Sequence, residues 1–274
     1  METHLTNYAE SANPETQRHF KDIPAYLRDV LLWCSYSYVP SPANYLWLVR
    51  RLLEPMTHEV LFIVLNYDTL LEDALSLYSP GFAIASMDDY VAMDPVKVVK
   101  VHGSTSWVVP IAGTARSPNW RDAVAAFDPL DPAHDRRVML DTRREQSYLI
   151  RNIGTGDFMY PWLTAPTRGK TFRCPDTHRE VARRFLRDCR KFLVVGTSGL
   201  DDDLLTELRD VTAGSEFPYL IHYVDPSSAV EDRFSSAIPA FCHRSPATPR
   251  SNRLRVGLNR YLAMPDLENL LAAR

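Results

Sequence analysis

The segment EVLFIVLNYDTLLEDAL, from Glu59 to Leu75, decides the fold that the sequence predicts. Its first half is an apolar, β-branched run, which is typical of a parallel strand covered on both faces. Its second half repeats leucine and alanine at helical spacing and predicts a helix. Asn66 and Asp68 stand at the junction, where a core strand gains nothing from polar side chains. The junction therefore indicates a binding site.

The bulk composition is that of an ordinary globular protein. The chain has 274 residues, of which 45% are hydrophobic and 24% charged, and its formal net charge is −3. This charge balance does not indicate the basic surface that binds the phosphate backbone of a nucleic acid. No apolar run reaches the roughly 20 residues that a membrane span needs, and the polar start lacks the apolar core of a signal peptide. We therefore expect a cytoplasmic protein with no membrane contact and no direct nucleic-acid binding.

The cysteine spacing excludes a zinc ribbon. No two cysteines form the CxxC pair that such a site needs, so we read all four as reduced thiols and expect no metal. They are Cys34, Cys174, Cys189 and Cys242.

Further strand and helix patterns follow the first. Apolar runs predict strands over 96–107, over 192–195 and before Asp225, and helical spacing predicts helices over 176–189, 202–214 and the C-terminal tail. We expect residues 1–22 to be frayed, a helix over 23–39, a loop over 160–172, and an irregular insertion or lid over 112–151. The order predicts an α/β fold with a parallel sheet and right-handed crossovers.

All four predicted strands end in small or polar residues. In open α/β sheets the ligand binds outside the carboxyl ends of the strands. Each end alone has a structural explanation, such as a tight turn or a helix cap, but four at one edge favour a binding site. The residues are Asn66, Asp68, His102, Gly103, Ser104, Gly196, Thr197, Ser198 and Asp225.

The residue types indicate the chemistry. The turn 196–198 offers backbone N–H groups and hydroxyls that suit phosphate or ribose oxygens, and Asp225 can accept from ribose hydroxyls. The Asn66 amide both donates and accepts without ionising, and His102 can take a proton near neutral pH. This pair fits displacement at a sugar carbon. A Ser104–His102 hydrolase stays open as an alternative.

The motifs LNYDTLLEDAL, VKVHGSTSW and FLVVGTSGLDDDLL, in that order, resemble the SIR2-like family. The resemblance covers about residues 45–225 and implies a Rossmann-like parallel sheet with helices on both faces and an NAD pocket. In bacterial anti-phage defence proteins of this family it implies hydrolysis of NAD to nicotinamide and ADP-ribose. It assigns catalysis to Asn66 and His102, and cofactor binding to Asp68, Gly103, Ser104, Gly196, Thr197, Ser198 and Asp225.

The sequence also departs from the family pattern. The cysteine modules of deacylase sirtuins are missing, which disfavours protein deacylation. The glycine-rich diphosphate loop is missing too, since the first glycine is Gly81 and the loop needs glycine for close backbone approach. We expect a single SIR2-like domain over 1–274 that is truncated at its N-terminus. A rebuilt sheet centre is the other explanation.

Two functions stay open at this point. The first is an NAD glycohydrolase, and the second is a sensor that binds NAD or ADP-ribose without cleaving it. Protein partners also stay open between a second copy of the chain and a neighbouring defence protein. Trp107 and residues 160–170 either close over the nicotinamide end of the ligand or pack in the core.

Overall fold

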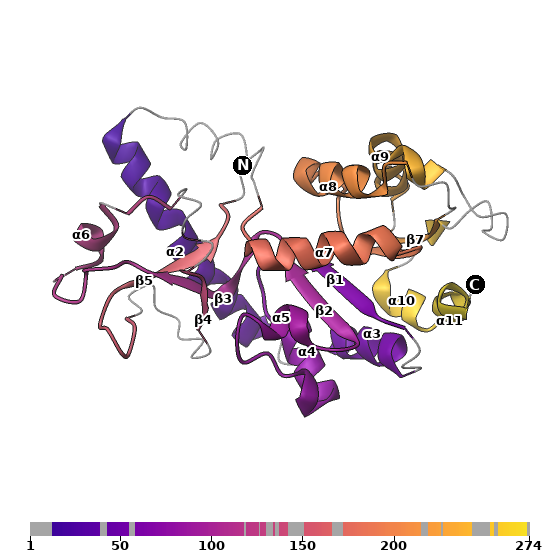
Figure 1. Ribbon diagram of the computed structural model, residues 1–274, viewed down its shortest axis with the longest axis horizontal. Coiled ribbons are helices and arrows are strands. Elements are labelled where there is room, and N and C mark those ends of the chain that lie inside the picture. The colour runs from indigo at the N-terminus through magenta and orange to yellow at the C-terminus, as the bar shows by residue number, and fades with distance from the viewer. Residues whose placement is uncertain are drawn as a thin grey trace. The chain divides into compact units, whose positions relative to one another are not determined.

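The protein is mixed α/β, as the computed structural model in Figure 1 shows. The structure describes residues 13–38, 43–54, 58–117, 119–125, 127–129, 134, 137–141, 151–165, 172–214, 219–225, 227–242, 253–254 and 257–272. The chain divides into two compact units, one of residues 1–42 and 62–179 and the other of residues 43–61 and 180–274. The expectation of a single domain truncated at its N-terminus stays a prediction.

The first unit contains one small sheet formed by β1 and β2 and a second sheet in the order β4-β3-β5. Helix α5 packs on β2, and α2 packs on β3 and β5. The elements are α2 (Pro14–Tyr38), β1 (Val60–Val64), α4 (Leu70–Tyr78), η1 (Pro80–Phe82), α5 (Asp89–Ala92), β2 (Val96–Lys100), β3 (Gly103–Pro110), α6 (Trp120–Ala125), β4 (Met139–Leu140) and β5 (Met159–Leu163).

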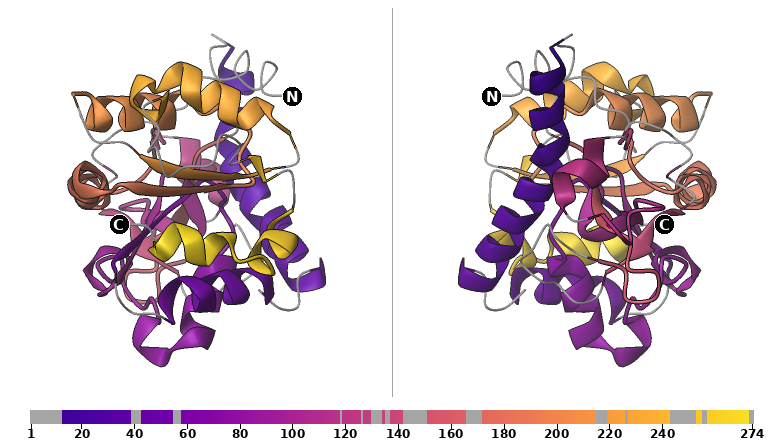
Figure 2. Two further views of the ribbon diagram at one scale, coloured as in Figure 1. Left: turned by 90° about the vertical axis from the view of Figure 1, so that its right-hand side faces the viewer. Right: turned by 90° about the vertical axis from the view of Figure 1, so that its left-hand side faces the viewer.

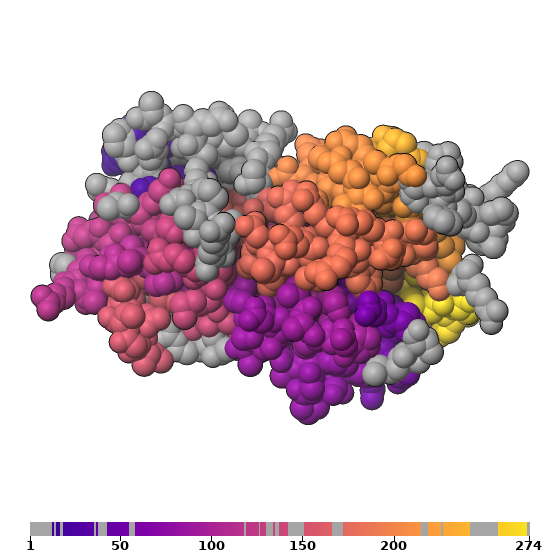
Figure 3. Space-filling view, in the orientation of Figure 1, coloured from indigo at the N-terminus to yellow at the C-terminus, as the bar shows by residue number. Residues whose placement is uncertain are grey.

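The second unit contains a parallel sheet in the order β6-β7-β8. Helices α8 and α9 lie on one side of this sheet and α10 and α11 on the other (Figure 2). Helices α8 and α9 contact each other and form a continuous orange surface in Figure 3. The elements are α3 (Ala43–Leu53), α7 (Asp176–Asp188, which begins in the first unit), β6 (Lys191–Val195), α8 (Asp202–Thr212), β7 (Leu220–Val224), α9 (Ala229–Ala237), η3 (Pro239–Cys242), β8 (Arg253–Leu254), α10 (Leu258–Leu262) and α11 (Asp266–Ala272).

Local sequence explains the helix ends near the candidate site. Helix α4 begins after Asp68, whose carboxylate accepts a hydrogen bond from the backbone N–H of Leu70 at 3.0 Å. Asp201 is the N-cap of helix α8, and its carboxylate accepts a hydrogen bond from the N–H of Leu204 at 3.0 Å. The helix is followed by Gly214 with φ +75°, a left-handed conformation that favours glycine after a helix.

The predicted strand 96–107 is wrong in its extent. It is broken at residues 101–102 into β2 and β3, and the break precedes Gly103 with φ +81°. Strand β3 pairs antiparallel with β5 and β4. The predicted loop over 160–172 is wrong as well, since its start belongs to β5, whose five residues are all buried.

Two other predicted segments need correction. The region 112–151 contains α6 and β4 and is therefore not wholly irregular. The helix predicted over 23–39 is α2, which begins at Pro14, so the expected fraying is wrong for residues 14–22 and residues 1–12 lie outside the described part of the chain. Buried Arg28 holds this helix against the sheet. Its guanidinium donates to Thr105 O of β3 at 2.7 Å and to Asp141 Oδ2 at 3.1 Å.

Candidate functional site

The loop after β1 and the turn after β2 lie at one end of their sheet. The N–H of Val101 donates to Val64 O at 3.2 Å, and the N–H of Thr105 donates to Tyr67 O at 2.8 Å. These two bonds flank Asn66 on one segment and His102 on the other. The structure therefore brings Asn66 and His102 to the same strand ends, as the sequence predicts.

The two side chains differ in their access to solvent. Asn66 is exposed, whereas His102 is only 1% exposed. The His102 ring lies 6.3 Å from the Phe172 ring, edge to face, and His102 O accepts from the N–H of Thr164 at 2.9 Å. The imidazole is therefore buried, with the Phe172 ring beside it, and residues 166–171 lie outside the described residues.

Asp68, Gly103 and Ser104 have structural roles in this unit. Gly103 touches β5 so closely that a Cβ atom would lie 2.1 Å from Trp162 O. Buried Ser104 donates to Tyr67 O at 3.3 Å and lies 3.1 Å from Ser106 Oγ. Asp68 is half-buried and holds the start of α4. Local contacts thus explain why each of these residue types occurs at its position. The role of the three residues in cofactor binding stays a prediction.

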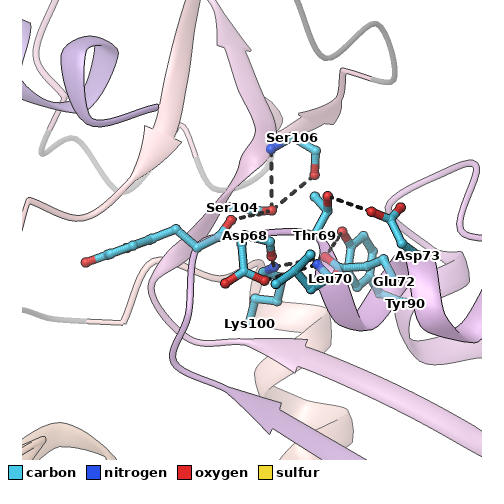
Figure 4. Close-up of polar contacts among 10 residues, drawn as sticks. Asp68, Thr69, Leu70, Glu72, Asp73, Tyr90, Lys100, Ser104 and Ser106 are labelled. Atoms are coloured by element: carbon cyan, nitrogen blue, oxygen red, sulfur yellow. Dashed lines mark hydrogen bonds and ion pairs between the residues drawn. The ribbon is translucent and has the colours of Figure 1, made fainter. Parts of the chain in front are cut away.

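Sequence reasoning missed a buried polar network below the loop. Lys100 is 0% exposed, and its ammonium donates to Asp68 O and, at 2.9 Å, to Glu72 Oε1 (Figure 4). Buried Tyr90 donates from its hydroxyl to the same Glu72 oxygen at 3.0 Å. Burial, and then the Glu72 charge, raise the pKa of Tyr90 well above its ordinary value. Lys100 lies within the largely apolar segment VKVVKV, and this could have indicated a buried charge in the sequence.

Trp107 belongs to the core and is not part of a lid. It is fully buried and lies edge-on to Tyr90 at 5.3 Å and to His178 at 5.7 Å between ring centroids. His178 Nε2 lies 2.9 Å from Met87 O, so the ring donates to that carbonyl and its Nδ1 is the unprotonated nitrogen. Burial lowers the pKa of His178, an effect that the Met87 carbonyl and Asp88 partly offset.

We expect acid to weaken the fold through His178. The unfolded chain takes up a proton near the ordinary pKa of about 6.5, whereas the folded protein resists it, so unfolding binds protons in this range. This stabilisation is complete above the ordinary pKa and is lost as the pH falls toward the lowered one. His178→Gln keeps a donor for Met87 O and should flatten the slope of the unfolding free energy against pH, by at most about 1.4 kcal/mol per pH unit.

Urea unfolding between about pH 5 and 7.5, where such linkage acts, measures the slope. Buried His222, whose pKa burial also lowers, keeps a residual slope in the same direction. An unchanged slope in the His178→Gln variant would contradict the assignment.

In the second unit the predicted residues meet at the ends of β6 and β7. The register pairs Val195 with Val224, so Gly196 and Asp225 follow neighbouring strand ends. Gly196 is exposed with φ +61° and open space where a Cβ atom would lie. One Asp225 oxygen accepts from the N–H of Ser227 at 2.7 Å. The structure therefore places these two residues at neighbouring strand ends, and their role in one binding site stays a prediction.

The turn after β6 is held by a residue that sequence reasoning missed. Thr197 Oγ1 accepts from the N–H of Gly199 at 3.2 Å, and Arg233 of α9 donates to Ser198 O. Arg233 and Ser198 are both exposed. The turn thus combines backbone N–H groups with a guanidinium, which is chemistry that suits a phosphate oxygen.

The predicted site residues therefore form two groups, one in each unit. The first combines an exposed amide with a covered imidazole, and the second combines an open glycine turn with a carboxylate. Among the described residues, no three or more His, Cys, Asp or Glu side chains gather as metal ligands. In the same part of the chain, no helix is both long and apolar enough to cross a membrane. The expectation of no metal stays a prediction.

Comparisons with known proteins leave the family unassigned. A scan against protein-family models gives no match, and a search of curated proteins finds no relative of significant similarity.

Proposed function

We propose that this chain is a SIR2-like NAD glycohydrolase that cleaves NAD to nicotinamide and ADP-ribose. The observation that supports it is the exposed Asn66 amide on an anchored loop, at the same strand ends as His102. The motif order in the sequence and the parallel strands β6 and β7 are compatible with a Rossmann-like NAD fold. A cytoplasmic role in anti-phage defence is part of the proposal.

The proposed reaction displaces nicotinamide from the ribose C1′ by water. The water oxygen forms a bond to C1′ while the bond from C1′ to the nicotinamide nitrogen breaks. The bonding electron pair leaves with nicotinamide, which becomes neutral, and the water proton passes to the imidazole of His102. Asn66 holds the water or the ribose hydroxyls in line, so positioning supplies most of the rate gain.

This reaction requires His102 to become accessible. Its ring is buried beside Phe172, so this mechanism requires the Phe172 side chain to move aside when NAD binds.

The second unit by itself offers candidate contacts for a nucleotide. Backbone N–H groups of Gly196 and Ser198 suit the diphosphate or ribose oxygens. Asp225 uses one oxygen for Ser227 and has further lone pairs for ribose hydroxyls. Arg233 joins this set as a candidate phosphate contact.

A sensor that binds NAD or ADP-ribose without cleaving it is the second candidate. The burial of His102 favours it, because a covered imidazole cannot accept the water proton. The sequence also lacks the glycine-rich diphosphate loop, which fits weak binding of NAD without its cleavage.

One sample decides between the two candidates. We expect calorimetric titration with NAD to give a binding isotherm, and nicotinamide to appear afterwards in the same cell. Heat without nicotinamide would identify the sensor. Neither heat nor nicotinamide would contradict both candidates. Acetyl-peptide turnover, tested in parallel, would show a deacylase instead.

A further inference from the structure

Residues 100–105 anchor the loop that carries Asn66. Tyr67 O accepts from the N–H of Thr105 at 2.8 Å and from the Ser104 hydroxyl at 3.3 Å. Asp68 O accepts from the ammonium of Lys100 (Figure 4). Asn66 is therefore the exposed residue of a loop whose next two carbonyls are both bonded.

Lys100 differs from the other anchors because it is a buried charge. Its side chain is 0% exposed, and Glu72 supplies the opposite charge at 2.9 Å. Glu72 lies on the first turn of α4, the helix that begins directly after the loop, and Tyr90 donates to the same carboxylate oxygen. One ammonium thus joins the end of β2, the loop and the start of α4.

A buried ion pair stabilises a protein interior less efficiently than apolar side chains do. Removing two charges from water costs free energy that their attraction repays only with good geometry and further hydrogen bonds. Apolar side chains of similar volume would fill the same space without that cost. The bond to Asp68 O is the contribution that an apolar side chain cannot replace.

We propose that Lys100 is a positioning residue that holds Asn66 in its reactive orientation. This inference rests on the proposed NAD hydrolysis. The Lys100 side chain is 0% exposed, so it acts on the site through the loop. It fixes Asp68 O, and with it the backbone direction two residues after Asn66. Glu72 holds the ammonium in place, and Tyr90 in turn holds Glu72.

A double substitution separates this role from stability. Lys100→Met alone leaves Glu72 buried without its cation, so we expect this variant to unfold or to lose stability. Lys100→Met with Glu72→Gln removes both charges while Tyr90 keeps an acceptor. We expect the double variant to recover its melting temperature and to lack the anchor on Asp68 O.

Two measurements on the folded double variant test the positioning role. Amide exchange of residues 65–71 should become about 10- to 100-fold faster, the effect of losing one charged hydrogen bond. The kcat for NAD cleavage should fall by about 100-fold, the size of effect expected from a misplaced group, while KM changes much less. A purely structural role would leave both readouts unchanged once stability is recovered.

Lys97→Met is the matched control. Lys97 lies on the same strand but bonds only to Met93 O and Asp94, away from the loop, in the interactions that the structure describes. We expect its loop exchange and kcat to match those of the unmodified protein.

The outcomes distinguish this inference from the proposed function. If the double variant is stable and keeps normal loop exchange and kcat, the positioning role is wrong. If the unmodified protein releases no nicotinamide, the proposed function fails, and loop exchange alone decides whether Lys100 orders the loop.

Discussion

Gly103→Ala is expected to lower the free energy of unfolding by about 3–5 kcal/mol, from left-handed backbone strain and overpacking together. Gly103 has φ +81°, and a Cβ atom there would lie 2.1 Å from Trp162 O and 2.7 Å from Leu163 Cα. Both contacts are backbone atoms of β5, so no side-chain rotation relieves them. Since whole domains have stabilities of about 5–15 kcal/mol, much of the protein should be unfolded at moderate urea concentrations.

Gly113→Ala is the matched control for this substitution. Gly113 also has a positive φ, +78°, but nothing lies within 4 Å of the position of its Cβ atom. Only the backbone strain remains, so we expect a loss of about 1–2 kcal/mol. Urea unfolding followed by far-ultraviolet circular dichroism measures both. Equal losses in the two variants would show that the approach of β5 to Gly103 is not tight.

Asn66→Ala is expected to lower the kcat of NAD cleavage by about 100- to 1,000-fold, the range measured when one polar group that stabilises a transition state is removed. The side chain is exposed, so the substitution should leave the melting temperature close to that of the unmodified protein. Asn66→Asp keeps the shape and loses the amide donor, and we expect it to be almost as slow. A nicotinamide assay under saturating NAD measures the effect.

The control is Asn269→Ala, at an exposed position of α11 in the second unit. It makes the same chemical change far along the chain and should leave kcat unaltered. Full activity in a folded Asn66→Ala protein would remove the main support for the proposed reaction.

The sequence predicts well those elements whose pattern is local. Strands β1, β6 and β7 are apolar runs followed by polar residues, and α7 and α8 have regular helical spacing. Strand β5 escaped prediction because it contains a proline and is buried on both faces, so it shows no alternation. Its pairing with β3 is set by partners distant in the sequence.

The same distinction applies to the site. Asn66 and His102 lie at neighbouring strand ends because β1 pairs with β2, and a sequence pattern can predict this. His102 is buried and its ring lies beside Phe172, a contact that no local pattern predicts. Lys100 and Glu72 were missed because single charges usually lie at the surface, and only the fold places these two side by side in the interior.

The buried pair of Lys100 and Glu72 also constrains how this protein can diverge. A change at either position alone leaves an isolated charge in the interior, so an intermediate with one substitution is selected against. Homologous sequences should therefore show covariation between these two positions, with lysine and glutamate retained together or exchanged together for neutral residues.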